Sequence, residues 1–394
     1  MKICGIVSEY NPFHSGHAYL IGQAKEKADV VVAIMSGHFV QRGDVAIVDK
    51  YTRAKCALLG GADLVLELPI PFCVSSASFF ARAGVDILAM VGAEMIAFGS
   101  ESGDEGRLLT IADRLLAEAD RRELAAEEGS AAAHFKGLLD GEKDRLSPND
   151  ILAVEYLSAI RKRKIDMSPL AVLRVGDGFL CETTGSSAYA SATALRKCMR
   201  DGDADAMKNY MPNACLDPLR VALENGDAPA ALYGAERAIL SFFRLTAPEA
   251  LAEVAGLGNG LEYRLCECAA KSRTLDEMLS LAATKRYPNA AIRRAIIHAM
   301  LGVSYADLDG GVAYTTVLGA NQSGRTLLAS LRKKGLPILT KPSDIDVLCA
   351  RHKENEEAIR RQAVLSARAD ALYSLCLPNA GTADRYIKRD AVIL

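Results

Sequence analysis

The sequence predicts an α/β fold, in which a parallel sheet covered by helices is followed by a mainly α-helical C-terminal domain. Apolar segments of strand length alternate with segments of helical periodicity up to about residue 200, which is the pattern of βαβ units. Residues 30–34 are apolar without alternation, as in strands that helices cover on both faces. The 394 residues exceed the usual size of one hydrophobic core, so we expect two domains, residues 1–200 and residues 201–394.

Each element of the N-terminal domain follows from its local composition. The strands are short apolar runs, most of which end at or near a glycine or proline. The helices carry apolar residues at helical spacing, and one of them opens with Ser147 as its N-cap and Pro148 at its first position. An Ala/Glu/Arg-rich helical insertion occupies residues 104–146. The expected strands are residues 2–7, 29–37, 63–69, 94–100 and 168–176, and the expected helices are residues 15–28, 51–62, 76–92, 147–164 and 186–199.

Beyond Gly202 the pattern is almost entirely that of helices separated by glycine and proline, and the last hundred residues add one strand pair. Charge is distributed unevenly along the chain. Residues 285–394 carry 17 Lys and Arg against 10 Asp and Glu, a net charge of +7, whereas the whole chain has −2 and the preceding part therefore −9. This basic C-terminal region predicts either a polyanionic partner that docks at one end or a solvated helical surface.

Composition also limits the cellular setting. No stretch approaches about 18 uncharged apolar residues, and the N-terminus lacks a basic-then-apolar signal pattern, so we expect a cytoplasmic protein without a membrane partner. The ten cysteines are scattered, and only Cys266 and Cys268 lie close together. That spacing on a helix directs the two side chains apart, which favours structural thiols over a zinc site or a disulfide framework.

The segment EYNPFHSGHAYL follows the first expected strand and places His14 and His17 one helical turn apart. Ligands of open parallel sheets bind at the carboxyl ends of strands, where this segment lies. The N-terminus of the following helix offers free N–H groups and a positive dipole, and two imidazole donors there would stabilise charge on a phosphoryl group. The alternatives are a zinc pair, for which no third ligand is evident, and two structural histidines buried beside Asn11 and Pro12.

Longer motifs narrow this interpretation. H-x-G-H after a first strand resembles the signature of the nucleotidyltransferase (HIGH) superfamily. The segments GIVSEYNPFHSGH, MSGHFVQRGDVAIVDKYTRAKCALLGGADLVLELP, FGSESG, SPNDILAVEY, ASATALR, TKRY and YTTVLGANQSGR together resemble the bacterial tRNA(Met) cytidine acetate ligase family. The resemblance covers nearly the whole chain, except residues 104–146 and the last fifty residues.

The resemblance implies a Rossmann-like parallel sheet, an ATP-binding catalytic domain and a mainly helical tRNA-binding domain. It also implies a reaction in two steps, in which acetate and ATP give acetyl-adenylate and pyrophosphate. The acetyl group then passes to N4 of the wobble cytidine of elongator tRNA(Met), and AMP leaves. The partners would be acetate, this tRNA and ATP as a substrate with Mg²⁺. The alternatives are a small-molecule adenylyltransferase or AMP-forming ligase on the same fold, and a tRNA-binding protein with a vestigial nucleotide site.

The resemblance also assigns residues to the ATP site, with His14 and His17 as the catalytic pair. The ATP residues would be Val7, Ser8, Glu9, Tyr10, Asn11, Pro12, Phe13, His14, Ser15, Gly16, His17, Ala18, Tyr19, Leu20, Gly99, Asn149, Arg174, Ser191, Thr193 and Arg196. Capping of a helix is the structural alternative for Ser191 and Thr193.

Two further groups of polar residues are candidates for substrate contacts. Gln41, Arg42, Asp49 and Lys50 would shape the acetate or cytidine pocket, or would form surface salt bridges instead. Glu67 needs a partner if it is buried, and Arg53 or Lys55 is the candidate. Contacts to tRNA phosphates are expected from Lys285, Arg286, Arg293 and Arg294, and also from residues 161–164 and 332–334.

The sequence departs from the family pattern at two places. Ser15 replaces the asparagine that is usual inside the motif, which we expect to be tolerated. After KRY this chain has PNAAIRR where the family commonly shows Thr and Arg, which weakens the tRNA assignment around Pro288 and Asn289 more than it weakens the catalytic assignment.

Overall fold

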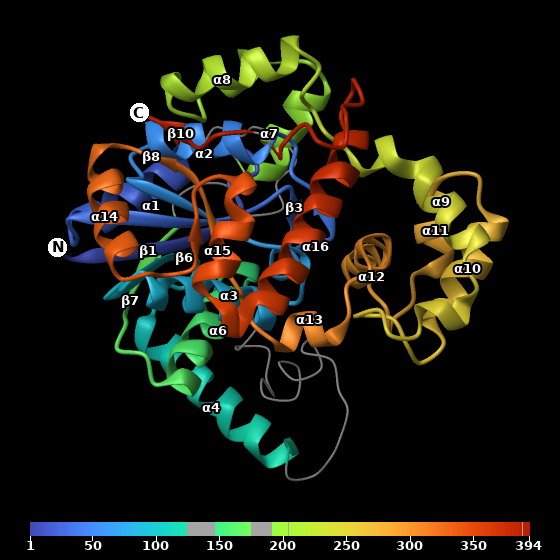
Figure 1. Ribbon diagram of the computed structural model, residues 1–394, viewed down its shortest axis with the longest axis horizontal. Coiled ribbons are helices and arrows are strands. Elements are labelled where there is room, and N and C mark those ends of the chain that lie inside the picture. The colour runs from blue at the N-terminus through green and yellow to red at the C-terminus, as the bar shows by residue number, and fades with distance from the viewer. Residues whose placement is uncertain (124–145, 175–190, 204, 388) are drawn as a thin grey trace.

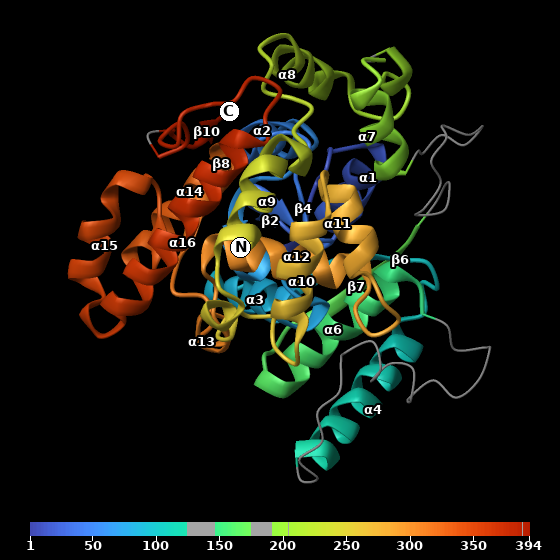
Figure 2. The same cartoon turned by 90° about the vertical axis from the view of Figure 1, so that its right-hand side faces the viewer.

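A computed structural model describes residues 1–123, 146–174, 191–203, 205–387 and 389–394. A twisted central sheet lies on one side of the molecule, and helices of the C-terminal half form a separate group on the other side (Figure 1). Viewed from that other side, the C-terminal helices lie in front of the sheet (Figure 2).

The parallel part of the sheet has the strand order β5-β2-β1-β6-β7. Numbered along the chain, these five parallel strands are ordered 3-2-1-4-5, so the order reverses between β1 and β6. Every residue of β2 is buried, which agrees with its uniformly apolar sequence. The predicted parallel sheet is thus confirmed. The strands are β1 (Ile3–Ser8), β2 (Val30–Ser36), β5 (Leu64–Leu68), β6 (Met95–Ser100) and β7 (Ser168–Leu173).

Helices connect these strands as the periodicity predicted. Ser147 caps its helix, because its hydroxyl accepts a hydrogen bond from the Asp150 N–H at 3.2 Å, and Pro148 is the first helical residue. Helix α3 packs closely on β1, where a Cβ at Gly84 would lie 2.7 Å from Val7. The helices are α1 (Ser15–Lys25), α2 (Lys50–Leu59), α3 (Ala77–Met90), α6 (Pro148–Arg163) and α7 (Ala192–Arg200).

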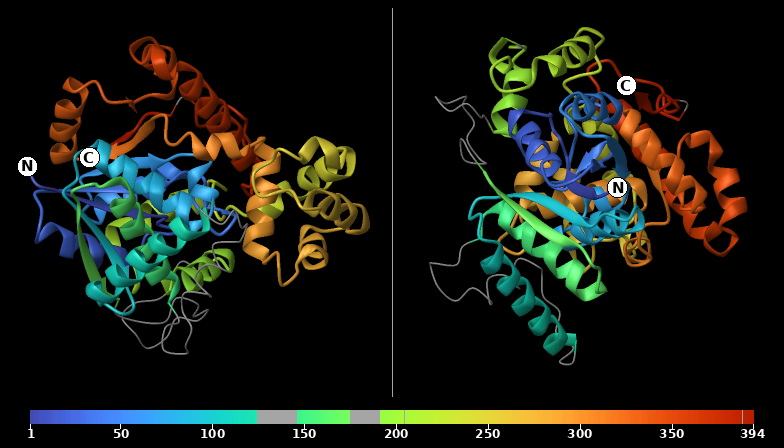
Figure 3. Two further views of the ribbon diagram at one scale, coloured as in Figure 1. Left: turned by 90° about the horizontal axis from the view of Figure 1, so that it is seen from below. Right: turned by 90° about the vertical axis from the view of Figure 1, so that its left-hand side faces the viewer.

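The insertion after β6 begins as the predicted helix, α4 (Glu105–Glu123), which packs along α6 and extends away from the sheet (Figure 3). Residues 124–145 of the insertion lie outside the described part of the chain.

The C-terminal half contributes strands to the same sheet. A strand pair was expected in the last hundred residues, but its pairing with the N-terminal strands was not predicted. Strand β8 (Thr315–Ala320) pairs antiparallel with β5, and β9 (Ile338–Leu339) and β10 (Val392–Ile393) pair parallel with β8. All six residues of β8 are buried. A short hairpin of β3 (Phe39–Val40) and β4 (Asp44–Val45) was also not predicted. Strands from both sides of residue 200 share one sheet. The division of the chain into two domains at that residue stays a prediction.

The remaining C-terminal elements are helical. Helices α9 to α12 form the group at the right of Figure 1, and α16 returns along the molecule to the sheet. Among the described residues no helix is long and apolar enough to cross a membrane, and the nine cysteines are free. The helices are α8 (Asn213–Glu224), α9 (Glu236–Leu245), α10 (Leu261–Lys271), α11 (Leu275–Ala282), α12 (Asn289–Leu301), α13 (Tyr305–Asp309), α14 (Gln322–Lys333), α15 (Ile345–Arg351) and α16 (Glu356–Leu375).

Candidate functional site

A cavity of about 410 Å³ opens where the strand order reverses, beside the carboxyl ends of β1 and β6. We call it the switch-point cavity. Its walls come from the end of β1, the first turns of α1, α6 and α7, the β3–β4 hairpin, and the ends of β6 and β7. The histidine motif, predicted for the end of the first strand, is part of this wall.

His14 and His17 lie against each other in the cavity wall. Their rings stack with centroids 3.7 Å apart, and the Tyr10 ring packs edge-on against His17 at 4.9 Å. Each Nδ1 accepts a backbone hydrogen bond, that of His14 from the Gly16 N–H at 3.1 Å and that of His17 from the His14 N–H at 3.2 Å. An Nδ1 that accepts carries no proton, so a neutral ring must carry its proton on Nε2.

Electrostatics keeps both rings neutral. Burial, followed by the nearby positive charge of Arg174, lowers the pKa of His14 to about 3. Burial also lowers the pKa of His17 well below its usual value, with further contributions from His14 and Arg174. Near neutral pH the pair therefore presents two neutral Nε2–H donors to an anion in the cavity.

Fewer backbone N–H groups are free at the N-terminus of α1 than the sequence predicted. The Ser15 N–H donates to the Tyr210 carbonyl at 2.8 Å, the Gly16 N–H to the His14 ring, and the His17 N–H to the His14 carbonyl at 2.9 Å. The prediction of free N–H groups at α1 is wrong for these three amides, because the His14 ring, the His14 carbonyl and the Tyr210 carbonyl already accept from them. The imidazoles and the helix dipole remain available to an anion.

Most of the segment from Val7 to Leu20 lines the switch-point cavity. Pro12, Phe13, Ser15 and Ala18 do not belong to its wall, and Phe13 is instead buried against Tyr10. The residues of this segment in the wall are Val7, Ser8, Glu9, Tyr10, Asn11, His14, Gly16, His17, Tyr19 and Leu20.

The opposite wall contains the predicted residues Gly99, Asn149 and Arg174. A carboxylate that sequence reasoning missed holds two of them together, because Glu101 accepts a hydrogen bond from the Asn149 amide at 2.5 Å and lies 3.6 Å from the Arg174 guanidinium. Its position directly after β6 was the available signal. A Cβ at Gly99 would lie 3.3 Å from Arg174, so the arginine stem passes close over this strand end.

The first turn of α7 contributes Thr193 and Arg196 to the wall. The Arg196 guanidinium donates to the Asn11 carbonyl at 2.8 Å and to the Thr193 hydroxyl at 3.0 Å. Ser191 lies outside the wall and caps the helix by accepting from the Ala194 N–H at 3.1 Å. For Ser191 the structural alternative therefore applies, since its hydroxyl completes the N-terminus of α7.

The four residues predicted for a substrate pocket separate into two pairs. Gln41 and Arg42 line the switch-point cavity, whereas Asp49 and Lys50 do not. The buried Asp49 carboxylate caps α2 by accepting from the Tyr51 N–H at 2.9 Å. For Asp49 and Lys50 the pocket prediction is corrected, because both are buried in structural roles.

Lys50 belongs to a buried charge cluster between the sheet and α16. Its ammonium lies 3.0 Å from Glu67 and 3.3 Å from Asp370, and Asp370 is also 2.7 Å from the His38 ring. The expectation that Arg53 or Lys55 pairs with Glu67 is therefore wrong. Lys50 reaches Glu67 because α2 begins beside the carboxyl end of β5.

Arg53 holds the two loops that flank the histidine segment. This fully buried guanidinium donates to the Glu9 carbonyl at 2.6 Å, the Ser36 carbonyl at 3.0 Å and the Gly37 carbonyl, and its Nε donates to the Val48 carbonyl at 2.9 Å. The backbone at the ends of β1 and β2 is fixed by this one side chain.

The residues predicted to contact tRNA also divide into two pairs. Lys285 and Arg286 are exposed before α12. Arg293 lies 3.7 Å from Asp44, and Arg294 donates to the Gln41 carbonyl at 3.2 Å, so both support the hairpin that lines the cavity. Burial lowers the pKa of the Arg294 guanidinium.

Apolar side chains complete the cavity, and they were not predicted. They come from α3, α6 and the ends of β6 and β7, and their aromatic members would suit a flat heterocyclic ring. They are Phe80, Phe98, Ile151, Leu152, Tyr156, Val172 and Leu173.

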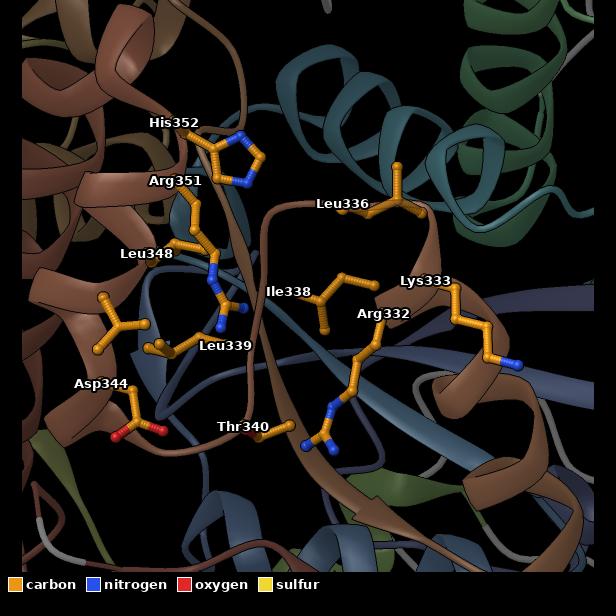
Figure 4. Close-up of a pocket in the computed structure, with 12 residues that line it drawn as sticks. Arg332, Lys333, Leu336, Ile338, Leu339, Thr340, Asp344, Leu348, Arg351 and His352 are labelled. Atoms are coloured by element: carbon orange, nitrogen blue, oxygen red, sulfur yellow. The ribbon is translucent and has the colours of Figure 1, made fainter.

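A second cavity of about 640 Å³ lies between α14 and α15 (Figure 4). Arg332 and Lys333 of α14 and Arg351 of α15 lie on the two sides of the segment Leu336–Thr340. Its described lining contains one carboxylate, Asp344, and one histidine, and no stacked histidine pair. It lacks the paired donors of the switch-point cavity, which we therefore take as the candidate site.

Comparisons with known proteins agree with this geometry. Residues 1–386 match the family described as HIGH Nucleotidyl Transferase. The chain is 33% identical over 406 residues to the tRNA(Met) cytidine acetate ligase of Acetivibrio thermocellus, covering 96% of each protein. It is also 33% identical to the ligase of the same name from Syntrophomonas wolfei, over 97% of this chain and 96% of the relative.

Solved structures give the same result. The crystal structure of Thermotoga maritima TmcAL in its apo form superposes with a TM-score of 0.91 at 30% identity, covering both chains completely. The structure of the same protein bound with alpha-thio ATP gives a TM-score of 0.88 over the same coverage. This chain therefore belongs to the tRNA(Met) cytidine acetate ligase family of HIGH nucleotidyltransferases.

Proposed function

We propose that this protein is an ATP-dependent, AMP-forming acetate ligase that modifies tRNA. Acetate attacks the α-phosphorus of ATP, which gives acetyl-adenylate and pyrophosphate. The N4 amine of the wobble cytidine of elongator tRNA(Met) then takes the acetyl group, and AMP leaves. The observation that carries this proposal is the pair of neutral, stacked imidazoles with both Nδ1 atoms occupied in the wall of the switch-point cavity.

In this proposal His14 and His17 donate their Nε2–H groups to the phosphates of ATP. Because their tautomer is fixed before substrate binds, no ring has to reorganise as negative charge shifts toward the departing pyrophosphate. Arg174 and Arg196 add fixed positive charge from two other sides of the cavity. The apolar wall around Phe98 would receive the adenine.

Mg²⁺ would enter with the nucleotide. It commonly binds through substrate phosphates, waters and one or two carboxylates. Among the described residues no group of three or more His, Cys, Asp or Glu side chains is placed to hold a metal by itself. Asp44 in the cavity wall is paired with Arg293, so the ion would be carried chiefly by the phosphates.

The proposed tRNA partner would approach over the β3–β4 hairpin. Arg293 and Arg294 join α12 to this hairpin. The exposed Lys285 and Arg286 lie directly before α12, so they belong to the segment next to the hairpin. Basic side chains there would contact the phosphate backbone and contribute little base specificity.

The test measures the two steps separately. Pyrophosphate release from ATP and labelled acetate reports the first step, and label transfer to an elongator tRNA(Met) transcript reports the second. Activation without transfer would favour a small-molecule ligase, and no acetate-dependent pyrophosphate release would refute the proposal. His14→Asn keeps a side-chain acceptor for the Gly16 N–H and removes the Nε2 donor. We expect it to slow activation about 10²–10³-fold while tRNA affinity is retained.

A further inference from the structure

Two carboxylates face the switch-point cavity in the described part of the chain, and they differ in whether an oxygen is left to bind a ligand. Asp44 is engaged by Arg293 at 3.7 Å and accepts the Val45 N–H at 2.8 Å. Glu9 accepts the Gln41 N–H with Oε1 at 2.9 Å, and its Oε2 has no hydrogen bond from any residue that the structure describes. One Glu9 oxygen is thus anchored, and the other remains available to a ligand.

The position of Glu9 is fixed by its surroundings. Its carbonyl accepts from the buried Arg53 guanidinium at 2.6 Å. Two residues later, the Asn11 side chain accepts the Ile47 N–H at 2.8 Å, and the Asn11 carbonyl accepts from Arg196. A carboxylate on backbone held in this way can keep one geometry toward a substrate, as catalytic groups require.

The proposed reaction needs a base in only one of its two steps. Acetate is already ionised when it attacks phosphorus, so activation requires no proton acceptor. In the transfer step the cytidine N4 forms a bond to the acetyl carbonyl carbon, and the carbon–oxygen bond to the phosphate breaks with its electron pair leaving on AMP. The N4 nitrogen must then lose a proton, and a base must take it.

The other titratable groups in the wall are poor candidates for that base. The lowered pKa values of His14 and His17 make both rings weak bases, and Arg42, Arg174 and Arg196 are cations. Tyr10, Tyr19 and Tyr156 are phenols, and burial raises the pKa values of Tyr10 and Tyr156. Burial also raises the pKa of Glu9, against the opposing charges of Arg196, Arg42 and Arg53, so this carboxylate is a stronger base than an exposed one.

We infer that Glu9 accepts the N4–H of the target cytidine and takes its proton during acetyl transfer, an assignment that rests on the proposed function. A carboxylate is the natural acceptor for the amino group of cytosine, so the same contact would also help to select this base. Glu9 would therefore be a catalytic residue of the second step only.

The test compares Glu9→Gln with the wild type in both half-reactions. Glutamine keeps the side-chain oxygen that accepts the Gln41 N–H but is not a base. We expect single-turnover acetyl transfer to fall about 10²–10⁴-fold, and to fall at least about tenfold more than acetate-dependent pyrophosphate exchange. Glu26→Gln makes the same chemical change at an exposed position of the adjoining helix and should leave both steps unchanged.

Equal loss of both steps in Glu9→Gln would show that Glu9 serves the nucleotide or its metal and would overturn the assignment, as would unchanged transfer. A wild-type enzyme that performs neither step would overturn the proposed function as well, so the two failures are distinguishable. Glu9→Asp provides a second measurement, because it retains a carboxylate. Its transfer rate should be reduced and still rise with pH as the acid ionises, whereas a rate independent of pH would contradict a role as base.

Discussion

Replacing Lys50 by methionine tests whether the charge cluster beneath the site stabilises the fold. The Lys50 side chain is 5% exposed, and those of Glu67 and Asp370 are 10% and 11% exposed. Removal of the Lys50 ammonium, which contacts both carboxylates, leaves two buried negative charges without this partner. Loss of one partner of a buried pair typically costs about 3–5 kcal/mol, and we expect that decrease in the free energy of unfolding.

Urea unfolding followed by circular dichroism measures the effect at pH 7 and at pH 5. Lys271→Met is the matched control, since Lys271 forms an exposed pair with Glu267 in which both side chains are more than 60% exposed. It should cost less than about 1 kcal/mol. The variant Lys50→Met/Glu67→Gln should recover part of the loss, because one of the two unpaired charges is then absent.

The pH dependence has a definite sign. Burial raises the pKa of Glu67, and Lys50 opposes that rise, so the pKa should rise further in Lys50→Met. Burial raises the pKa of Asp370, but the charges and hydrogen bonds of Lys50 and His38 outweigh it and hold the pKa below its usual value of 3.8, so Asp370 stays ionised in the wild type at both pH values. The change between pH 7 and pH 5 comes from Glu67, because its further raised pKa in Lys50→Met favours proton uptake at the lower pH. The difference between wild type and Lys50→Met should therefore shrink toward acid pH. A decrease in the free energy of unfolding no larger than that of Lys271→Met, or a decrease that is larger at pH 5 than at pH 7, would refute this reasoning.

Three further predictions follow from the site and its supports. Gly43→Ala should lower the melting temperature more than Gly335→Ala. Both glycines have positive φ, but only at Gly43 would the new Cβ lie 2.6 Å from α12. Equal shifts of the melting temperature in the two variants would contradict a packing role for Gly43. Arg174→Gln should raise KM for ATP about tenfold through loss of a charge-assisted contact, and steady-state kinetics with unchanged KM would exclude that contact. Charge reversal at Lys285 and Arg286 should weaken tRNA binding and flatten its salt dependence while pyrophosphate exchange continues; an unchanged salt slope would place the RNA elsewhere.

The sequence predicted the parallel sheet well because its signals are local. Each strand of the parallel part is a mainly apolar run, and each connecting helix has a periodic face or a cap. The order of strands is not local information, so the apolar wall around Phe98 and Tyr156 could not be assigned to the cavity. The pairing of β8 with β5 was missed for a related reason, because it joins residues about 250 positions apart.

In the candidate site, too, local features could be predicted from the sequence and long-range contacts could not. The motif located His14 and His17, but the hydrogen bonds that fix their tautomer depend on ring orientation. Lys50 appeared to be a pocket residue because it follows a polar loop, and only the fold reveals that α16 brings Asp370 to it. Pairing between buried charges that lie far apart in the sequence leaves no periodic pattern from which it could be predicted.

The most direct test of the central claim is a crystal structure of this protein with a non-hydrolysable ATP analogue. We expect its phosphate oxygens about 2.7–3.2 Å from the Nε2 atoms of His14 and His17, with both Nδ1 atoms still accepting their backbone hydrogen bonds. An analogue bound only in the basic cavity between α14 and α15, or phosphates that leave both imidazoles without contact, would contradict the account.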